Sequence, residues 1–199
     1  ARGMVQASQS ASLLVLGARG QGGFKELLLG SVSQRALHHA TCPVVIVRTP
    51  ATGDMSEHGR IVVGVDGSPA GDAALRWAGQ EAQIRGAELR VVHAAPSAYV
   101  DSPLPDPVRI IDVVQREANA VLEQAILRCD LPASVKIDPV AADGSPAKAL
   151  LDASSDADLV VVGRTGQSLL RGLLVGSVAT QLSHHSIVPT VFVSSSGTA

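Results

Sequence analysis

Short apolar runs alternate along this chain with longer segments whose apolar residues recur every three or four positions. Ile61–Val65 and Leu159–Val162 are two of the runs, and their uninterrupted apolar character predicts buried parallel strands. The segment from Val108 to Cys129 shows the helical spacing, with apolar residues at Ile111, Val114, Ala118, Val121, Leu122 and Ala125. This alternation extends over roughly 135 residues and predicts an α/β domain with a parallel sheet.

The expected elements of this domain follow from the same pattern. Strands are expected at 61–65, 88–94, 135–140, 159–162 and 190–193, and helices at 69–85, 108–129, 146–154 and 177–185. Ser68 and Pro69 are suited to start the first of these helices, and Gly86 to end it. Right-handed crossovers favour a Rossmann-like doubly wound five-stranded sheet of order 3-2-1-4-5. In this order strands 1 and 4 are neighbours, at the point where such sheets bind ligands.

The beginning of the chain repeats its end at an offset of 146 residues. Between 10–47 and 156–193, 16 of 38 positions are identical. They include two histidine pairs and a proline before the last strand: His38-His39 with His184-His185, and Pro43 with Pro189. The repeat predicts three parts: residues 1–50 as the C-terminal part of a truncated first domain, 51–59 as a linker, and 60–194 as a complete domain. Whether the chain is a piece of a longer tandem protein or a partial gene copy stays open.

A partial copy cannot bury both faces of its own sheet, so we expect it to pack on the complete domain or on another chain. Val44–Val47 and Thr190–Val193 are the equivalent fifth strands of the two copies. Exposed apolar edges pair readily, so we expect these strands to pair antiparallel, within one chain or across a homodimer. Charged substitutions at Val45 and Val191 are expected to weaken this association.

A glycine-rich stretch connects the fourth strand to the fourth helix. Gly163 and Gly166 follow the strand, and Gly176-Ser177 opens the helix. Glycines let backbone N–H groups approach a ligand, and a helix N-terminus presents unpaired N–H groups to anions. Asp66, at the end of the first strand, is expected beside this loop. The spacing recurs from Gly17 to Ser31, but that copy has no first-strand aspartate and is expected to serve a structural role.

Composition excludes several classes of partner. Aromatic residues make up 2% of the chain and the net charge is −2, which argues against nucleic-acid binding. No apolar run reaches the ~18 residues of a membrane span. Cys42 and Cys129 have neither metal-site nor redox spacing, so two free thiols in a cytoplasmic protein are expected. Adjacent histidines do not form a chelating pair on a helix, so no metal ligands are expected.

These motifs resemble those of the universal stress protein family. The resemblance rests on four segments: Val63-Gly64-Val65-Asp66-Gly67-Ser68, His93, Gly144-Ser145-Pro146, and Gly163-x2-Gly166-x9-Gly176-Ser177. The last of them is the signature of the ATP-binding branch. The resemblance implies a stress-response regulatory or sensor protein that binds ATP or another adenine nucleotide, cyclic AMP in some relatives, with or without Mg²⁺. It also implies dimers or tandem pairs that associate through the fifth strands.

The same resemblance implies the roles of individual residues. Val65, Asp66 and Gly67 would lie at the adenine and ribose end, with Ala94 near the base. Gly163 and Gly166 would lie against ribose and phosphates. The phosphates would be met by Gly176, Ser177 and Val178. Arg164 would either meet phosphates or remain solvated, as would Arg171. Relatives that bind ATP often carry a hydroxyl at the position of Ala179, so one phosphate contact is expected to be missing.

Two other functions remain alternatives at this stage. A weak ATPase would need a base beside the phosphates, and the sequence offers no obvious catalytic residue or P-loop. A nucleotide-free dimerisation module is disfavoured for the complete domain by its intact glycine loop, but it suits the partial copy.

Overall fold

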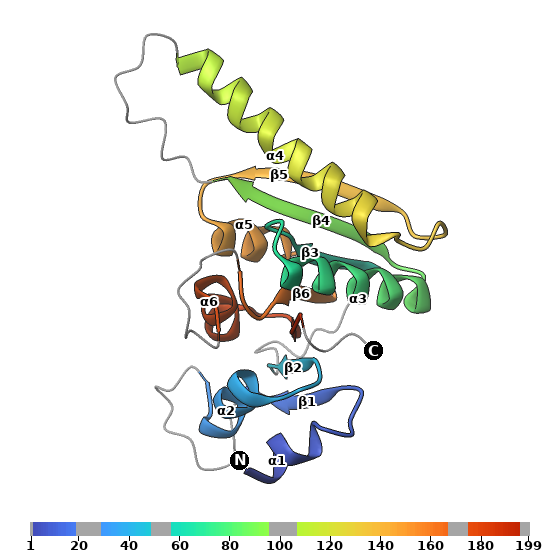
Figure 1. The fold of residues 1–199 in the computed structure, drawn as a ribbon, viewed down its shortest axis with the longest axis vertical. Coiled ribbons are helices and arrows are strands. Elements are labelled where there is room, and N and C mark those ends of the chain that lie inside the picture. Colours follow the sequence, from blue (N-terminus) through green and yellow to red (C-terminus); the bar gives the residue numbers. More distant parts are fainter. Residues whose placement is uncertain (1, 19–28, 49–56, 96–106, 167–174, 196–199) are drawn as a thin grey trace.

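A computed structural model describes residues 2–18, 29–48, 57–95, 107–166 and 175–195. It contains one seven-stranded sheet flanked by helices (Figure 1). The strands are β1 (Leu14–Gly17), β2 (Val44–Val47), β3 (Arg60–Gly64), β4 (Glu88–Ala95), β5 (Ile137–Asp143), β6 (Leu159–Gly163) and β7 (Thr190–Val193). The helices are α1 (Arg2–Ala7), α2 (Ser31–His39), α3 (Pro69–Arg85), α4 (Pro107–Cys129), α5 (Pro146–Ala153) and α6 (Ser177–His185).

Residues 57–195, which we call the C-terminal unit, form five parallel strands in the order β5-β4-β3-β6-β7. Numbered along this unit, that order is 3-2-1-4-5, so the predicted fold class and strand order are confirmed. β3 and β6 are hydrogen-bonded neighbours, with Val62 opposite Val160. The carboxyl ends of these two strands therefore open at the same place, which is the switch point of the sheet.

Alternate strand residues face two separate apolar layers. Ile61, Val63 and Val161 are fully buried with the apolar residues of α3 and α4 on one face. Val62 and Val160 are fully buried on the other face, where α5 and α6 pack. Because both faces are covered, the strands need no polar alternation, which explains the apolar runs seen in the sequence.

The start of α3 is determined by a short local network. The hydroxyl of Ser68 accepts a hydrogen bond from the N–H of Gly71 (3.1 Å), so Ser68 is the N-cap, and Pro69 follows it as predicted. A carboxylate oxygen of Asp66 accepts from the N–H of Ser68 (3.0 Å). Between them Gly67 has φ 76°, a left-handed conformation that favours glycine. This network fixes the direction in which the chain leaves β3.

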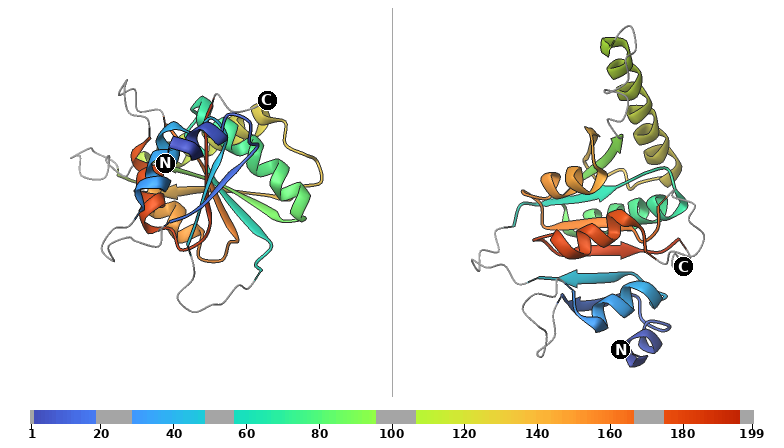
Figure 2. Two further views of the ribbon diagram at one scale, coloured as in Figure 1. Left: turned by 90° about the horizontal axis from the view of Figure 1, so that it is seen from below. Right: turned by 90° about the vertical axis from the view of Figure 1, so that its left-hand side faces the viewer.

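Residues 2–48, which we call the N-terminal unit, extend the same sheet. β1 and β2 are parallel, and β2 pairs antiparallel with β7, with Val45 opposite Val191 (Figure 1; Figure 2, right). The expected pairing of the two fifth strands is thus present within one chain. The proposed linker lies mostly outside the described residues, which resume at Glu57.

Two arginines cross between the units in a nearly symmetric way. Arg164, from the C-terminal unit, donates to the carbonyl oxygens of Ala40 (2.7 Å) and Leu37 (3.3 Å) at the end of α2. Arg48, from the N-terminal unit, donates to the carbonyl oxygen of Ser183 (2.5 Å) near the end of α6. Both guanidinium groups therefore lie at the negative end of a helix, where a cation is stabilised.

Among the described residues of the N-terminal unit, 2–18 and 29–48, no helix corresponds to α3. Val161 of β6 is 0% exposed because α3 covers it, whereas the equivalent Val15 of β1 is 57% exposed. The opposite face of β1 is covered: Leu14 packs in the layer that contains α2, α5 and α6. One face of the N-terminal unit is therefore buried and the other is partly open.

One histidine at the end of each of the helices α2 and α6, His38 and His184, has a pKa below its ordinary value. Burial lowers the pKa of His38, and the positive charges of His39 and Arg164 lower it further. The same causes act on His184, where burial is again the largest and His185 and Arg48 add to it.

These pKa shifts predict a loss of stability in mild acid. An unfolded histidine titrates near pH 6.5, so below this pH the unfolded chain binds more protons than the folded one, and the free energy of unfolding falls. The contribution is fully present above about pH 6.5 and is lost as pH falls through the lowered folded-state values. Urea denaturation at a series of pH values measures it. The double variant His38→Gln, His184→Gln should show a smaller decline, and an identical pH profile would contradict this assignment.

Candidate functional site

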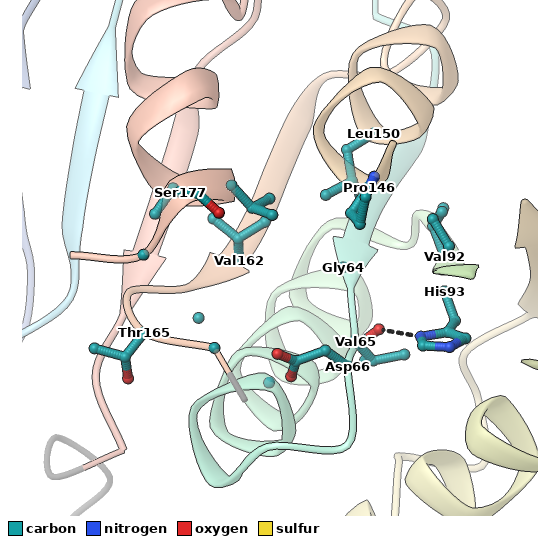
Figure 3. Close-up of a pocket in the computed structure, with 17 residues that line it drawn as sticks. Gly64, Val65, Asp66, Val92, His93, Pro146, Leu150, Val162, Thr165 and Ser177 are labelled. Carbon is teal, nitrogen blue, oxygen red and sulfur yellow. Dashed lines mark hydrogen bonds between the residues drawn. The ribbon is translucent and has the colours of Figure 1, made fainter. Parts of the chain in front are cut away.

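A cavity of about 470 Å³ opens at the switch point of the C-terminal unit (Figure 3). Its walls come from the carboxyl ends of β3, β4 and β6, the first turns of α5 and α6, and Gly71 in α3. Its size lies within the ~300–1,000 Å³ of small-molecule sites. The cavity thus lies at the switch point, where the strand order predicts a ligand site.

One end of the cavity is apolar. Val65, directly after β3, and Val92, in β4, form it, with Ala94, Pro146 and Leu150 beside them. Val92 and Leu150 are almost fully buried, so this wall is part of the packed core. Such a surface accommodates a flat apolar or aromatic group.

Asp66 projects into the cavity between this apolar end and the glycine turn after β6 (Figure 3). Two glycines make room for its carboxylate. A Cβ at Gly71 would lie 2.8 Å from Oδ1, and a Cβ at Gly166 would lie 2.8 Å from Oδ2. The carboxylate is therefore held against backbone on both sides, and it remains an acceptor for hydroxyl groups of a ligand.

The other end of the cavity is a backbone surface formed by the glycine turn and the start of α6. The N–H of Gly176 donates to the carbonyl oxygen of Arg164 (2.8 Å), which holds the turn against the helix. Gly176 is the N-cap and has no side chain to accept from the N–H groups of the first turn. Ser177 and Val178 follow it and line the cavity. Uncapped N–H groups at a helix N-terminus are suited to an anion.

The cavity gathers eight of the ten residues proposed from the sequence: Val65, Asp66, Ala94, Gly163, Gly166, Gly176, Ser177 and Val178. Gly67 is not among its lining residues, because it forms the turn between Asp66 and α3 instead. Arg164 is also absent from the lining. Its side chain points away to the end of α2, so the expectation that it meets phosphates or solvent is replaced by a contact with the N-terminal unit. Arg171 lies outside the described residues.

His93 is the main lining residue that the sequence did not assign to the site. Its Nδ1 lies 2.8 Å from the carbonyl oxygen of Val65. A carbonyl only accepts hydrogen bonds, so Nδ1 carries the proton and Nε2 is left as an acceptor. A signal was available in the sequence: His93 is a polar residue near the carboxyl end of its strand, beside the switch point.

Ala179 also lines the cavity, and the two units differ in the residue at this position. In the N-terminal unit the equivalent residue is Ser33, and its hydroxyl donates to the carbonyl oxygen of Gly17 (2.7 Å). The hydroxyl at this position thus bonds to the preceding strand end in one unit of this chain. Ala179 cannot make the equivalent hydrogen bond.

Three further features of the described residues concern the thiols, possible metal ligands and possible membrane spans. Both cysteines are free and buried, and burial raises the pKa of each thiol. No cluster of three or more potential metal ligands occurs among the residues described. Within the same ranges, no helix is long and apolar enough to cross a membrane.

The fold and the cavity define a Rossmann-like α/β protein with a glycine-rich turn at its switch point. The family model described as the universal stress protein family matches residues 4–48 and 57–194, and the chain belongs to this family. The two matched stretches correspond to the two units.

Individual relatives agree with this assignment. A universal stress protein of Mycobacterium tuberculosis is 36% identical over 191 residues, which cover 94% of this chain and 63% of that protein. The chain thus spans less than two thirds of the length of this relative. The crystal structure of a universal stress protein from Archaeoglobus fulgidus has a TM-score of 0.65 at 25% identity, covering 96% of this chain and 65% of that one. A universal stress protein in complex with cyclic AMP has a TM-score of 0.53 at 30% identity, covering 67% and 95%.

Proposed function

We propose that the C-terminal unit binds an adenine nucleotide, with ATP as the preferred ligand, and that the protein serves as a nucleotide-dependent regulator or sensor in a stress response. The observation that carries this proposal is the single cavity surface that joins an apolar end, a carboxylate and an uncapped helix N-terminus. The base, the ribose hydroxyls and the phosphates of an adenine nucleotide match the apolar end, the carboxylate and the helix N-terminus, in this order. The relative solved with cyclic AMP supports a ligand of this class.

Each part of the ligand has a suitable wall. The base would lie against Val65 and Ala94, and the ribose hydroxyls would donate to Asp66. The phosphates would accept from the N–H groups of Gly176, Ser177 and Val178 and from the Ser177 hydroxyl. The lining offers no cluster that would hold a metal alone. Any Mg²⁺ would therefore arrive bound to the phosphates.

Calorimetric titration of the whole chain with ATP, ADP and cyclic AMP, each with and without Mg²⁺, tests the proposal. ATP should bind and raise the unfolding midpoint, since a ligand at 100 times its Kd adds about 2.7 kcal/mol of stability. Tighter binding of cyclic AMP would keep the site but change its ligand. No heat and no thermal shift with any of the three nucleotides would refute the proposal.

Asp66→Asn should weaken ATP binding by roughly 10-fold or more, because a hydrogen bond to a charged group contributes about 1.5–3 kcal/mol. Asp143→Asn is the matched control. Asp143 also precedes a Gly-Ser-Pro sequence, but it lies at the end of β5 and does not line the cavity. Titration calorimetry on both variants measures the difference, and equal affinities would show that Asp66 does not contact the ligand.

Several broader assignments accompany this proposal. We infer that residues 1–50 are the C-terminal part of a first domain, joined by residues 51–59 to a complete domain at 60–194. The two buried free thiols favour a cytoplasmic location. The β2–β7 pairing within the chain corresponds to the fifth-strand association expected between domains, and sedimentation analysis would establish whether homodimers also form.

A further inference from the structure

We propose that Arg164 is a positioning residue of the nucleotide site, through which the N-terminal unit holds the glycine turn in its binding conformation. This inference rests on the proposed function and extends it. It assigns the N-terminal unit, which has no first-strand aspartate of its own, a role in the site of the C-terminal unit.

The backbone of Arg164 lies at the centre of the turn. Gly163 and Thr165, on either side of it, both line the cavity. Its N–H donates to the carbonyl oxygen of Val193 on β7 (2.7 Å), and its carbonyl oxygen accepts from the N–H of Gly176 (2.8 Å). One residue therefore connects the turn to β7 and to the start of α6. A shift of its backbone would move the glycine turn and the phosphate end together.

The side chain of Arg164 is anchored outside the C-terminal unit. Its Nη1 donates to the carbonyl oxygens of Ala40 and Leu37, the first at 2.7 Å and the second at 3.3 Å. Burial lowers the pKa of the guanidinium, with Cys42 acting in the opposite direction. A partly buried guanidinium depends strongly on the acceptors it has, so the end of α2 fixes its position.

The contact that Arg164 makes has no equivalent in the other copy of the repeat. The position equivalent to Arg164 is Ala18, which has no side chain that could reach α6. The reverse contact is made by Arg48, which binds the carbonyl oxygen of Ser183 in the last turns of α6, far along the helix from Ser177. Two contacts of similar chemistry thus cross the interface, and only the one from Arg164 reaches the cavity through adjacent backbone.

This pair supplies a matched experiment. Arg164→Met removes the hydrogen bonds to the carbonyl oxygens of Ala40 and Leu37, Arg48→Met removes the one to Ser183, and both variants keep much of the side-chain volume. In the whole chain, Arg164→Met should weaken ATP binding about 10-fold, whereas Arg48→Met should leave the Kd within about twofold. Arg164→Lys keeps the charge and should recover part of the affinity. Equal affinities of the two methionine variants would overturn the inference.

A second measurement is independent of nucleotide. Amide hydrogen exchange of Gly176, followed by NMR in the free protein, reports the hydrogen bond to the carbonyl oxygen of Arg164. Exchange should be about 10-fold faster in Arg164→Met and unchanged in Arg48→Met. If the parent chain binds no nucleotide but this difference appears, the proposed function fails and the positioning role stands. Equal exchange in both variants would refute the positioning role whatever the parent binds.

Discussion

Gly163→Ala should remove measurable nucleotide binding and destabilise the protein by about 1–3 kcal/mol, the usual cost of an overpacked core position. A Cβ at Gly163 would lie 2.8 Å from the carbonyl carbon of Ala70 and 2.9 Å from its oxygen. These are backbone atoms of the first turn of α3, so no side-chain rotation relieves the overlap. The strand end and the helix must separate, and this moves two walls of the cavity, which Gly163 and Gly71 both line. Titration calorimetry and thermal unfolding measure the two effects.

Gly3→Ala is the control for this prediction. A Cβ at Gly3, in α1, has no atom within 4 Å, and alanine is the better helix former by about 1 kcal/mol. Its stability should therefore be unchanged or slightly higher, with normal ATP affinity. A Gly163→Ala variant that binds ATP as the parent does would show that the turn tolerates a side chain and that the close approach to α3 is not required.

Val45→Asp should release the N-terminal unit from β7 and destabilise the chain by about 3–5 kcal/mol, the effect of leaving a buried charge without a partner. Val45 is 7% exposed and lies opposite Val191, which is fully buried. The carboxylate would enter the apolar layer shared by the two units. Urea denaturation measures the loss of stability. Faster amide exchange along β7 would show that its pairing with β2 is broken.

Val15→Asp is the matched comparison, because Val15 is paired directly with Val45 in register but is 57% exposed. The same chemical change there should alter stability by less than about 0.5 kcal/mol. Similar losses in the two variants would indicate that β1, and not the contact with β7, limits the stability of the N-terminal unit. An unchanged exchange rate along β7 in Val45→Asp would contradict the packing described above.

Much of this arrangement could be predicted from sequence, because its determinants are local. The N-cap at Ser68 and the stop at Gly86 follow from side-chain hydrogen bonding and from the left-handed conformation that glycine adopts. The apolar runs identify strands buried on both faces. The position of Asp66 beside the glycine turn follows from the strand order, since β3 and β6 must be neighbours at the switch point.

Of the parts that the sequence did not predict, one depends on a contact between distant segments and two depend on the path of the backbone just after Asp66. The place of Arg164 in the turn suggests a side chain that either meets phosphates or is solvated, and only the packing of α2 shows that it points to the carbonyl oxygen of Ala40. Gly67 belongs to the same motif as Asp66 but does not line the cavity, because it forms the left-handed turn between Asp66 and α3. Gly71 contacts the carboxylate because the helix start folds back over it, which no spacing rule reveals.

The β2–β7 pairing also limits how several copies of this chain could associate. Once β7 is paired within the chain, the sheet formed by the described residues ends at β1 on one side and at β5 on the other. Addition of β1 to β5 of the next copy is head-to-tail and would propagate without closing, whereas β1 against β1 is two-fold and closes after two chains. β1 is only four residues long, and short edges pair weakly. The short length of β1 therefore disfavours extension of the sheet through this edge.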